Sequence, residues 1–171
     1  MIRTSKARSS KGQSMVEFAL ALPILLLAIF GLFEVGRAVF MYAAVVNASR
    51  EAVRYATAYG VNESDVLHYH NCAEIRNTAR RVAFLLPLED DDILIEYDHG
   101  PGTSVFATCA SDETVDTSFE LACGDRVKVT VNVAYQPITS LIPIQPQSFV
   151  SSSARTFLGV IELTDEATEC N

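Results

Sequence analysis

The chain has 171 residues, of which 49% are hydrophobic, and carries a formal net charge of −8. This length accommodates one modest domain and one membrane segment, and it is too short for two sizeable cores. The first twelve residues hold four cations and no acid, so the remainder carries −12, because −8 minus +4 is −12. Such an acidic remainder repels phosphate backbones, which argues against a nucleic-acid partner.

One long apolar segment, residues 18–33, contains sixteen residues without charge and is bounded by Glu17 and Glu34. Its eleven Leu, Ile and Phe residues favour insertion into a bilayer by about 3–7 kcal/mol in total. As a helix it spans only about 24 Å, so flanking residues must also enter a hydrocarbon core of about 30 Å. A cleaved secretory signal is the competing interpretation, but no small-x-small cleavage site follows closely.

The cations ahead of this segment predict a single-pass protein of the cytoplasmic (inner) membrane, with its amino terminus in the cytoplasm and its carboxyl-terminal domain outside. We predict three parts along the chain. Residues 1–12 form a basic cytoplasmic leader, residues 13–59 form one transmembrane and amphipathic helix, and residues 60–171 form an exported α+β domain. Pro23 predicts a local kink inside the helix, and Gly60 predicts its end.

The exported part changes from helical to strand periodicity. A second helix is predicted between a cap at Asn62 or Ser64 and the stop at Pro87. Residues 89–92 form an acidic turn, for which a solvated loop is favoured over a calcium site.

Strands are predicted for residues 93–98, 126–135 and 148–160, with a short strand near residues 119–122 inside a polar loop. In residues 126–135 valines alternate with polar residues, which makes this the clearest strand. The fold class is therefore α+β, with a small antiparallel sheet of three or four strands packed on the exposed part of the long helix.

The four cysteines all lie on the exported side, where thiols oxidise. They allow three connectivities in two disulfides, and the sequence does not decide among them. We favour Cys109 with Cys123, which closes a short polar loop, and Cys72 with Cys170, which ties the tail to a helix.

The sequence lacks the signatures of an enzyme or a metalloprotein. It contains no G-x-S-x-G and no H-E-x-x-H motif, and it has only three histidines. On a helix, His68, His70 and Cys72 would spread around the cylinder, which favours surface histidines and a structural cysteine over a metal site. We expect no enzymatic activity, no metal, no cofactor and no small-molecule substrate.

Residues 12–18, GQSMVEF, combine a glycine at the end of the basic leader with a carboxylate at the edge of the apolar segment. A carboxylate there is costly unless it is protonated or paired. The pattern resembles the processing site of type IV pilin-like proteins, in which a membrane aspartyl peptidase cuts after the glycine. This resemblance implies cleavage between Gly12 and Gln13 and pairing of Glu17 with the new amine of a neighbouring subunit. The alternative is a snorkelling glutamate without a special partner.

The longer string from residue 12 to residue 56 resembles the TadE-like pseudopilins, minor subunits of the tight-adherence pilus system. The matching elements are Val16-Glu17-Phe18, Pro23, Glu34-x-Gly36-Arg37 and the segment 48–56. Phe18 stands where the major pilins of that system usually carry tyrosine. The resemblance implies a pilin-like fold, assembly through Glu17 and Phe18, and three kinds of protein partner besides the membrane: a prepilin peptidase, other pilin-like subunits and the Tad assembly platform.

Glu34 and Arg37 lie three residues apart where the helix is predicted to leave the bilayer. They can pair with each other on one helix face, or they can contact neighbouring subunits in a bundle. The sequence leaves both interpretations open.

A second function is compatible with the same pattern. A bitopic, membrane-anchored binding or sensor module would have the same helix and the same acidic domain, but it would keep its leader. Retention of residues 1–12 therefore separates the two functions.

Overall fold

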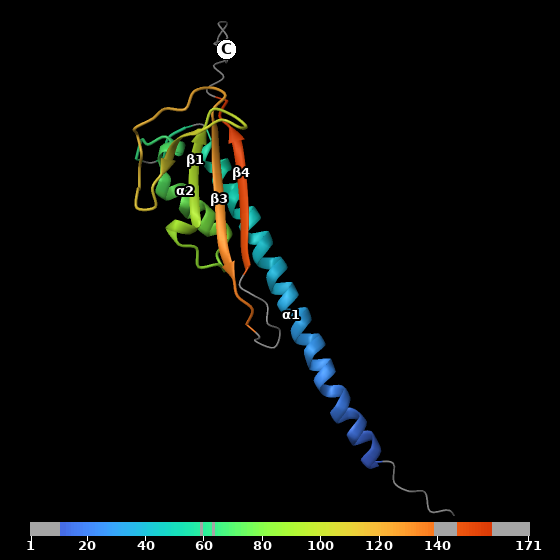
Figure 1. Ribbon diagram of the computed structural model, residues 1–171. Helices are drawn as coiled ribbons and strands as arrows, with labels where there is room; N and C mark the ends of the chain where they lie inside the picture. The colour runs from blue at the N-terminus through green and yellow to red at the C-terminus, as the bar shows by residue number, and fades with distance from the viewer. Residues whose placement is uncertain (1–10, 59, 63, 139–146, 159–171) are drawn as a thin grey trace, which may run out of the picture.

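The computed structural model describes residues 11–58, 60–62, 64–138 and 147–158 (Figure 1). Two α-helices, two short 3₁₀ helices and one four-stranded sheet form an α+β arrangement, as the sequence predicted. In chain order the elements are α1 (Lys11–Ala56), η1 (His68–His70), α2 (Cys72–Val82), η2 (Asp90–Asp92), β1 (Ile93–Asp98), β2 (Val105–Cys109), β3 (Arg126–Tyr135) and β4 (Gln147–Thr156).

Helix α1 is a single rod with two environments. Its amino-terminal half projects away from the domain, whereas its carboxyl-terminal half packs along the sheet (Figure 1). Small side chains at Ala48, Ser49, Ala52 and Ala56 are fully buried there, which lets the helix lie close to the strands. The helix continues through Pro23 without interruption.

The sheet has the strand order β2-β1-β3-β4, and all neighbouring strands are antiparallel. Strand β3 occupies the predicted residues, and its alternate valines are buried against the helices. Val129 lies opposite Ile95 on one side and Ser153 on the other. The two-residue period of this segment therefore determined both its strand and its buried face.

The second helix begins later than predicted. Asn62 does not cap a helix but folds a tight turn, because its side-chain oxygen accepts from the amides of Ser64 and Val66. Asp65 in that turn has a left-handed φ of 59°. Asn71 is the true cap of α2, and its side chain accepts from the Glu74 amide at 3.0 Å.

The strands also differ from the prediction at three places. Strand β2, Val105–Cys109, forms where no strand was predicted, because it pairs with β1. Residues 119–122 form no strand. Strand β4 ends at Thr156 rather than at residue 160. Whether these segments form strands depends on pairing with a neighbouring strand. Such pairing leaves only a weak pattern in the local sequence at a sheet edge.

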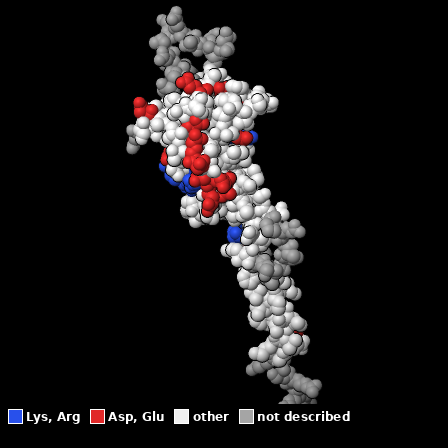
Figure 2. Space-filling view, turned by 60° about the vertical axis from the view of Figure 1, so that its left-hand side comes forward, with Lys and Arg blue, Asp and Glu red and all other residues white. Residues whose placement is uncertain are grey.

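Charge is distributed unevenly over the molecule. Figure 2 shows acidic side chains gathered in a column over the domain, whereas the projecting helix is almost free of charge. The exposed acids of η2 belong to this domain. The domain therefore suits an aqueous environment, and the projecting part of α1 suits an apolar one.

Cys72 and Cys109 form a disulfide, with 5.9 Å between their Cα atoms. Both favoured pairings are therefore wrong, because each of them used one of these two cysteines. The unforeseen strand β2 is the reason, since it carries Cys109 alongside the start of α2. Cys170 lies outside the described residues.

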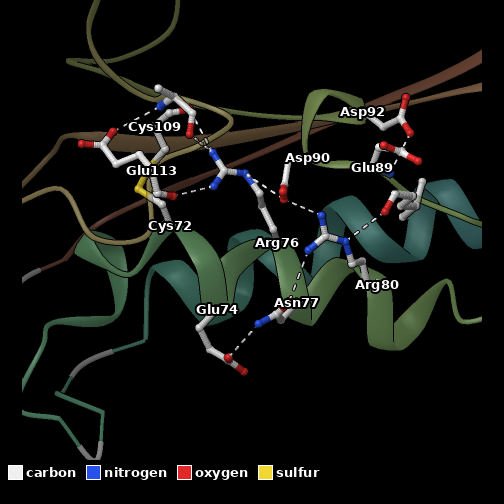
Figure 3. A network of polar contacts seen from close by, with 12 residues as sticks. Cys72, Glu74, Arg76, Asn77, Arg80, Glu89, Asp90, Asp92, Cys109 and Glu113 are labelled. Atoms are coloured by element: carbon white, nitrogen blue, oxygen red, sulfur yellow. Dashed lines mark hydrogen bonds and ion pairs between the residues drawn. A yellow bond between two sulfur atoms is a disulfide. The ribbon is translucent and has the colours of Figure 1, made fainter.

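A buried arginine strengthens this connection between α2 and β2 (Figure 3). The side chain of Arg76 is 2% exposed, and its guanidinium donates to the carbonyl oxygens of Cys109, Ala110 and Glu113. The carboxylate of Asp90 lies 3.9 Å from the same group. Because a fork of five donors satisfies several carbonyls at once, Arg76 fixes the loop after β2 against α2.

Asp98 and Arg126 join β1 to β3 through two hydrogen bonds of 2.7 and 2.8 Å. Hydrogen bonding from Arg126, together with the Gly100 amide, lowers the pKa of Asp98 below its usual value of 3.8. The stabilisation is therefore complete above about pH 4 and is lost as the pH falls through the lower folded pKa.

We expect Asp98→Asn to lower the free energy of unfolding by about 2–3 kcal/mol at neutral pH, because a charged hydrogen-bonded pair is broken. The variant should also lose less stability than the wild type on acidification. Thermal unfolding followed by circular dichroism at several pH values measures both effects. Glu96→Gln is the control, because its more exposed pair with Lys128 contributes less than about 1 kcal/mol. Equal losses in the two variants would contradict the assignment.

Candidate assembly site on the amino-terminal helix

The projecting half of α1 is apolar and uncovered. Among the described residues, this is the one helix long and apolar enough to cross a membrane, and none of its apolar window is buried against the domain. Exposing so much apolar surface to water is unfavourable, so lipid or other helices must cover it. The large side chains exposed there include Met15, Val16, Phe18, Leu20, Ile24, Leu25, Leu27, Ile29, Leu32 and Phe33.

Four residues singled out in the sequence lie in the first two turns of α1. Gly12 and Gln13 belong to the first turn, and the Gln13 amide donates to the Glu17 carboxylate at 3.2 Å. Phe18 is 65% exposed. Glu17 makes no ion pair with another described residue, so its charge is not neutralised within the described chain.

Helical geometry relates these residues to one another. Four residues correspond to about 6 Å along the axis, so the backbone nitrogen of Gln13 lies about one turn from the Glu17 side chain. A carboxylate in this position can accept hydrogen bonds from an ammonium group located at the same depth. Among the described residues, no cation pairs with the carboxylate at this end of the apolar rod.

A second cluster lies where α1 meets the end of β3. The Glu34 carboxylate, in a residue 8% exposed, accepts from Arg37 at 2.8 Å, from the Tyr135 hydroxyl at 2.6 Å and from the Ile138 amide at 3.2 Å. The Arg37 guanidinium lies 4.5 Å from the centre of the Tyr135 ring and also donates to the carbonyl of Gln136. We call this set of five residues the neck.

Glu34 and Arg37 form the internal pair that was one of their two interpretations. Besides each other, both residues contact the end of β3, so the pair anchors the sheet to the helix. Burial and the hydrogen bond to Glu34 raise the pKa of Tyr135, which therefore stays a neutral donor. Sequence reasoning missed Tyr135, although its position as the last alternating residue of a strong strand pointed to a buried face.

The histidines before α2 pack against aromatic side chains. His70 is buried, its ring nitrogen lies 2.5 Å from the carbonyl oxygen of Phe119, and its ring contacts the Phe119 ring edge-on. His68 contacts Tyr55 in the same way. Cys72 is in the disulfide. These three residues therefore have structural positions, although His70 is buried and not on the surface as predicted.

The fold and the uncovered helix together define a class of protein in which one long apolar helix both anchors and supports an α+β domain. Within that class, the family model described as TadE-like protein matches residues 12–54. The chain is TadE-like over this segment, which confirms the resemblance drawn from the sequence. The family suggests a pilus-associated structural protein and is not a family of enzymes. No curated protein and no solved structure matches the chain.

Proposed function

We propose that this chain is a minor pseudopilin of the tight-adherence pilus system. In this proposal a prepilin peptidase removes residues 1–12, and the mature chain assembles through α1 beside other pilin-like subunits on the Tad platform. The observation that carries the proposal is the uncovered apolar half of α1 with the unneutralised carboxylate of Glu17 at its end. The family match over the same residues supports it.

Cleavage after Gly12 would turn the backbone nitrogen of Gln13 into an ammonium group. That group can pair with Glu17 of a neighbouring helix, which removes the cost of holding a lone carboxylate at the edge of hydrocarbon. Two helices side by side would then cover apolar surface and neutralise charge in one step. Each subunit supplies one amine and one acid, so the same contact can repeat from subunit to subunit.

The neck gives this assembly a fixed geometry outside the membrane. Because Glu34 and Arg37 hold the end of β3 by hydrogen bonds, the domain cannot rotate freely about the helix. The position of each exported domain would follow from the packing of the helices. We place the protein in the inner membrane with its amino terminus in the cytoplasm, as the charge asymmetry predicts.

The amino terminus of the mature protein tests the proposal. In cells that contain the peptidase, the intact mass of the membrane-extracted chain should correspond to a start at Gln13. We expect Gly12→Ala to abolish processing, because a side chain at the scissile position obstructs the peptidase, whereas Ser10→Ala in the leader should be processed normally. A functional chain that keeps residues 1–12 would reject the proposal and favour the bitopic sensor.

A further inference from the structure

Strand β4 is an open edge of the sheet. It pairs with β3 through all ten of its residues, and among the described residues no strand lies on its other side (Figure 1). Such an edge presents unpaired backbone N–H and C=O groups, which form a template for another extended chain. The strand contains neither proline nor lysine, and its single charge is Arg155. Apart from Arg155, the strand therefore lacks the residues that commonly protect an open edge.

A groove runs beside this edge, between β4 and the carboxyl-terminal half of α1. Ser49 holds the two elements close together, because its hydroxyl lies 3.0 Å from those of Ser151 and Ser153. Beyond these serines the elements separate and leave two adjoining hollows of about 290 and 430 Å³. Arg54 and Arg155 line both hollows, and Arg50 lines the larger one.

The arginines of the groove differ from the other cations of the domain. Nine Arg and Lys residues lie between residues 34 and 158, and seven of them form an ion pair with a described acid. The two that form none with a described residue are Arg50 and Arg155, and both line the groove. Arg54 pairs with Glu51 at 3.4 Å, and both side chains are largely exposed.

Charge makes the groove selective. Three arginines and one glutamate give it a local charge of +2, because +3 minus 1 is +2, in a chain of net charge −8. The column of acids in Figure 2 shows the opposite sign over the domain. A ligand with negative charge would be attracted to the groove and repelled by the acidic column.

We infer that the groove is a docking site for an extended, acidic polypeptide segment of a partner protein. The segment adds to β4 as a fifth strand, and its carboxylates bind Arg50 and Arg155. Two features favour a peptide over another polyanion: the open row of backbone groups on β4, and the alternation of side chains along a strand, which places the carboxylates at every second position of the peptide on the side of the arginines. The inference does not depend on cleavage of the leader.

The test uses the full chain in uncharged detergent and a fluorescent ten-residue peptide that alternates threonine with glutamate. Fluorescence anisotropy should show saturable binding, and the same peptide with lysine for glutamate should not bind. The double variant Arg50→Glu with Arg155→Glu should weaken binding at least about tenfold. Arg81→Glu, which alters an exposed arginine on α2, should bind as the wild type does.

A second peptide, N-methylated at alternate residues, keeps its charge but cannot donate to a strand edge, and it should also bind at least about tenfold more weakly. Circular dichroism checks the fold of each variant, and Arg50→Gln and Arg155→Gln replace the double variant if it unfolds. The inference is overturned if the acidic peptide does not bind or if the arginine variants bind it normally. Equal binding of the N-methylated peptide, or tighter binding of inorganic polyphosphate, overturns it as well.

Discussion

Replacement of Glu17 by alanine is expected to leave processing after Gly12 intact and to remove the chain from the pilus apparatus. Breaking an ion pair in an apolar environment costs about 3–5 kcal/mol, because the remaining charge stays buried without a partner. This cost corresponds to association weaker by more than about a hundredfold. Co-purification of the variant with the other pilin-like subunits, quantified against the wild type, measures the effect.

Two further variants identify the charge of Glu17 as the cause. Glu17→Gln keeps a side chain that can bond to Gln13 but has no charge, so it should be as defective as Glu17→Ala. Val16→Ala removes part of an adjacent exposed side chain and should reduce assembly only slightly. Normal co-purification of Glu17→Gln would show that the amine pairing is wrong, even if the chain is a pseudopilin.

Loss of the disulfide should have the largest effect on the stability of the α+β domain. Cys72 and Cys109 are separated by 37 residues, and a cross-link over such a loop stabilises the fold by about 4 kcal/mol through the entropy of the unfolded chain. The double variant Cys72→Ala with Cys109→Ala should therefore unfold at a temperature lower by roughly 15 °C. Circular dichroism of the detergent-solubilised chain measures the shift.

Reduction of the wild type provides the control for this second prediction. Because the double variant lacks the bond already, a reducing agent should lower the unfolding temperature of the wild type more than that of the variant. Proteolytic fragments of the unreduced protein should contain Cys72 linked to Cys109. A fragment that links Cys109 to Cys123 would contradict the structure.

The elements with strong local patterns were predicted well. Strand β3 has the predicted residues, because valines at every second position can share one face only in a strand. Helix α1 runs to Ala56, close to the predicted end at residue 59, because apolar side chains recur along one face of a helix. These two elements already determined the α+β class and the position of the long helix at the amino-terminal end of the described chain.

The other elements were predicted poorly, either because a local turn competed with them or because they depend on a distant partner. The predicted second helix began too early, because a local turn at Asn62 competes with the helix for the same backbone groups. Strand β2 was missed because β1 supplies its hydrogen bonds. The predicted disulfide pairings were wrong for the same reason, since the position of Cys109 depends on the pairing of β2 with β1.

The sequence by itself determined the long apolar helix, the GQSMVEF motif and the resemblance to TadE-like proteins, because each depends on neighbouring residues in one continuous segment. Only the tertiary structure showed that Glu34 and Arg37 form the neck with Tyr135, a residue about a hundred positions away. It also brought Arg50 of α1 and Arg155 of β4 to the same groove. Long-range contacts of this kind follow from strand pairing and helix packing, and no local pattern encodes them.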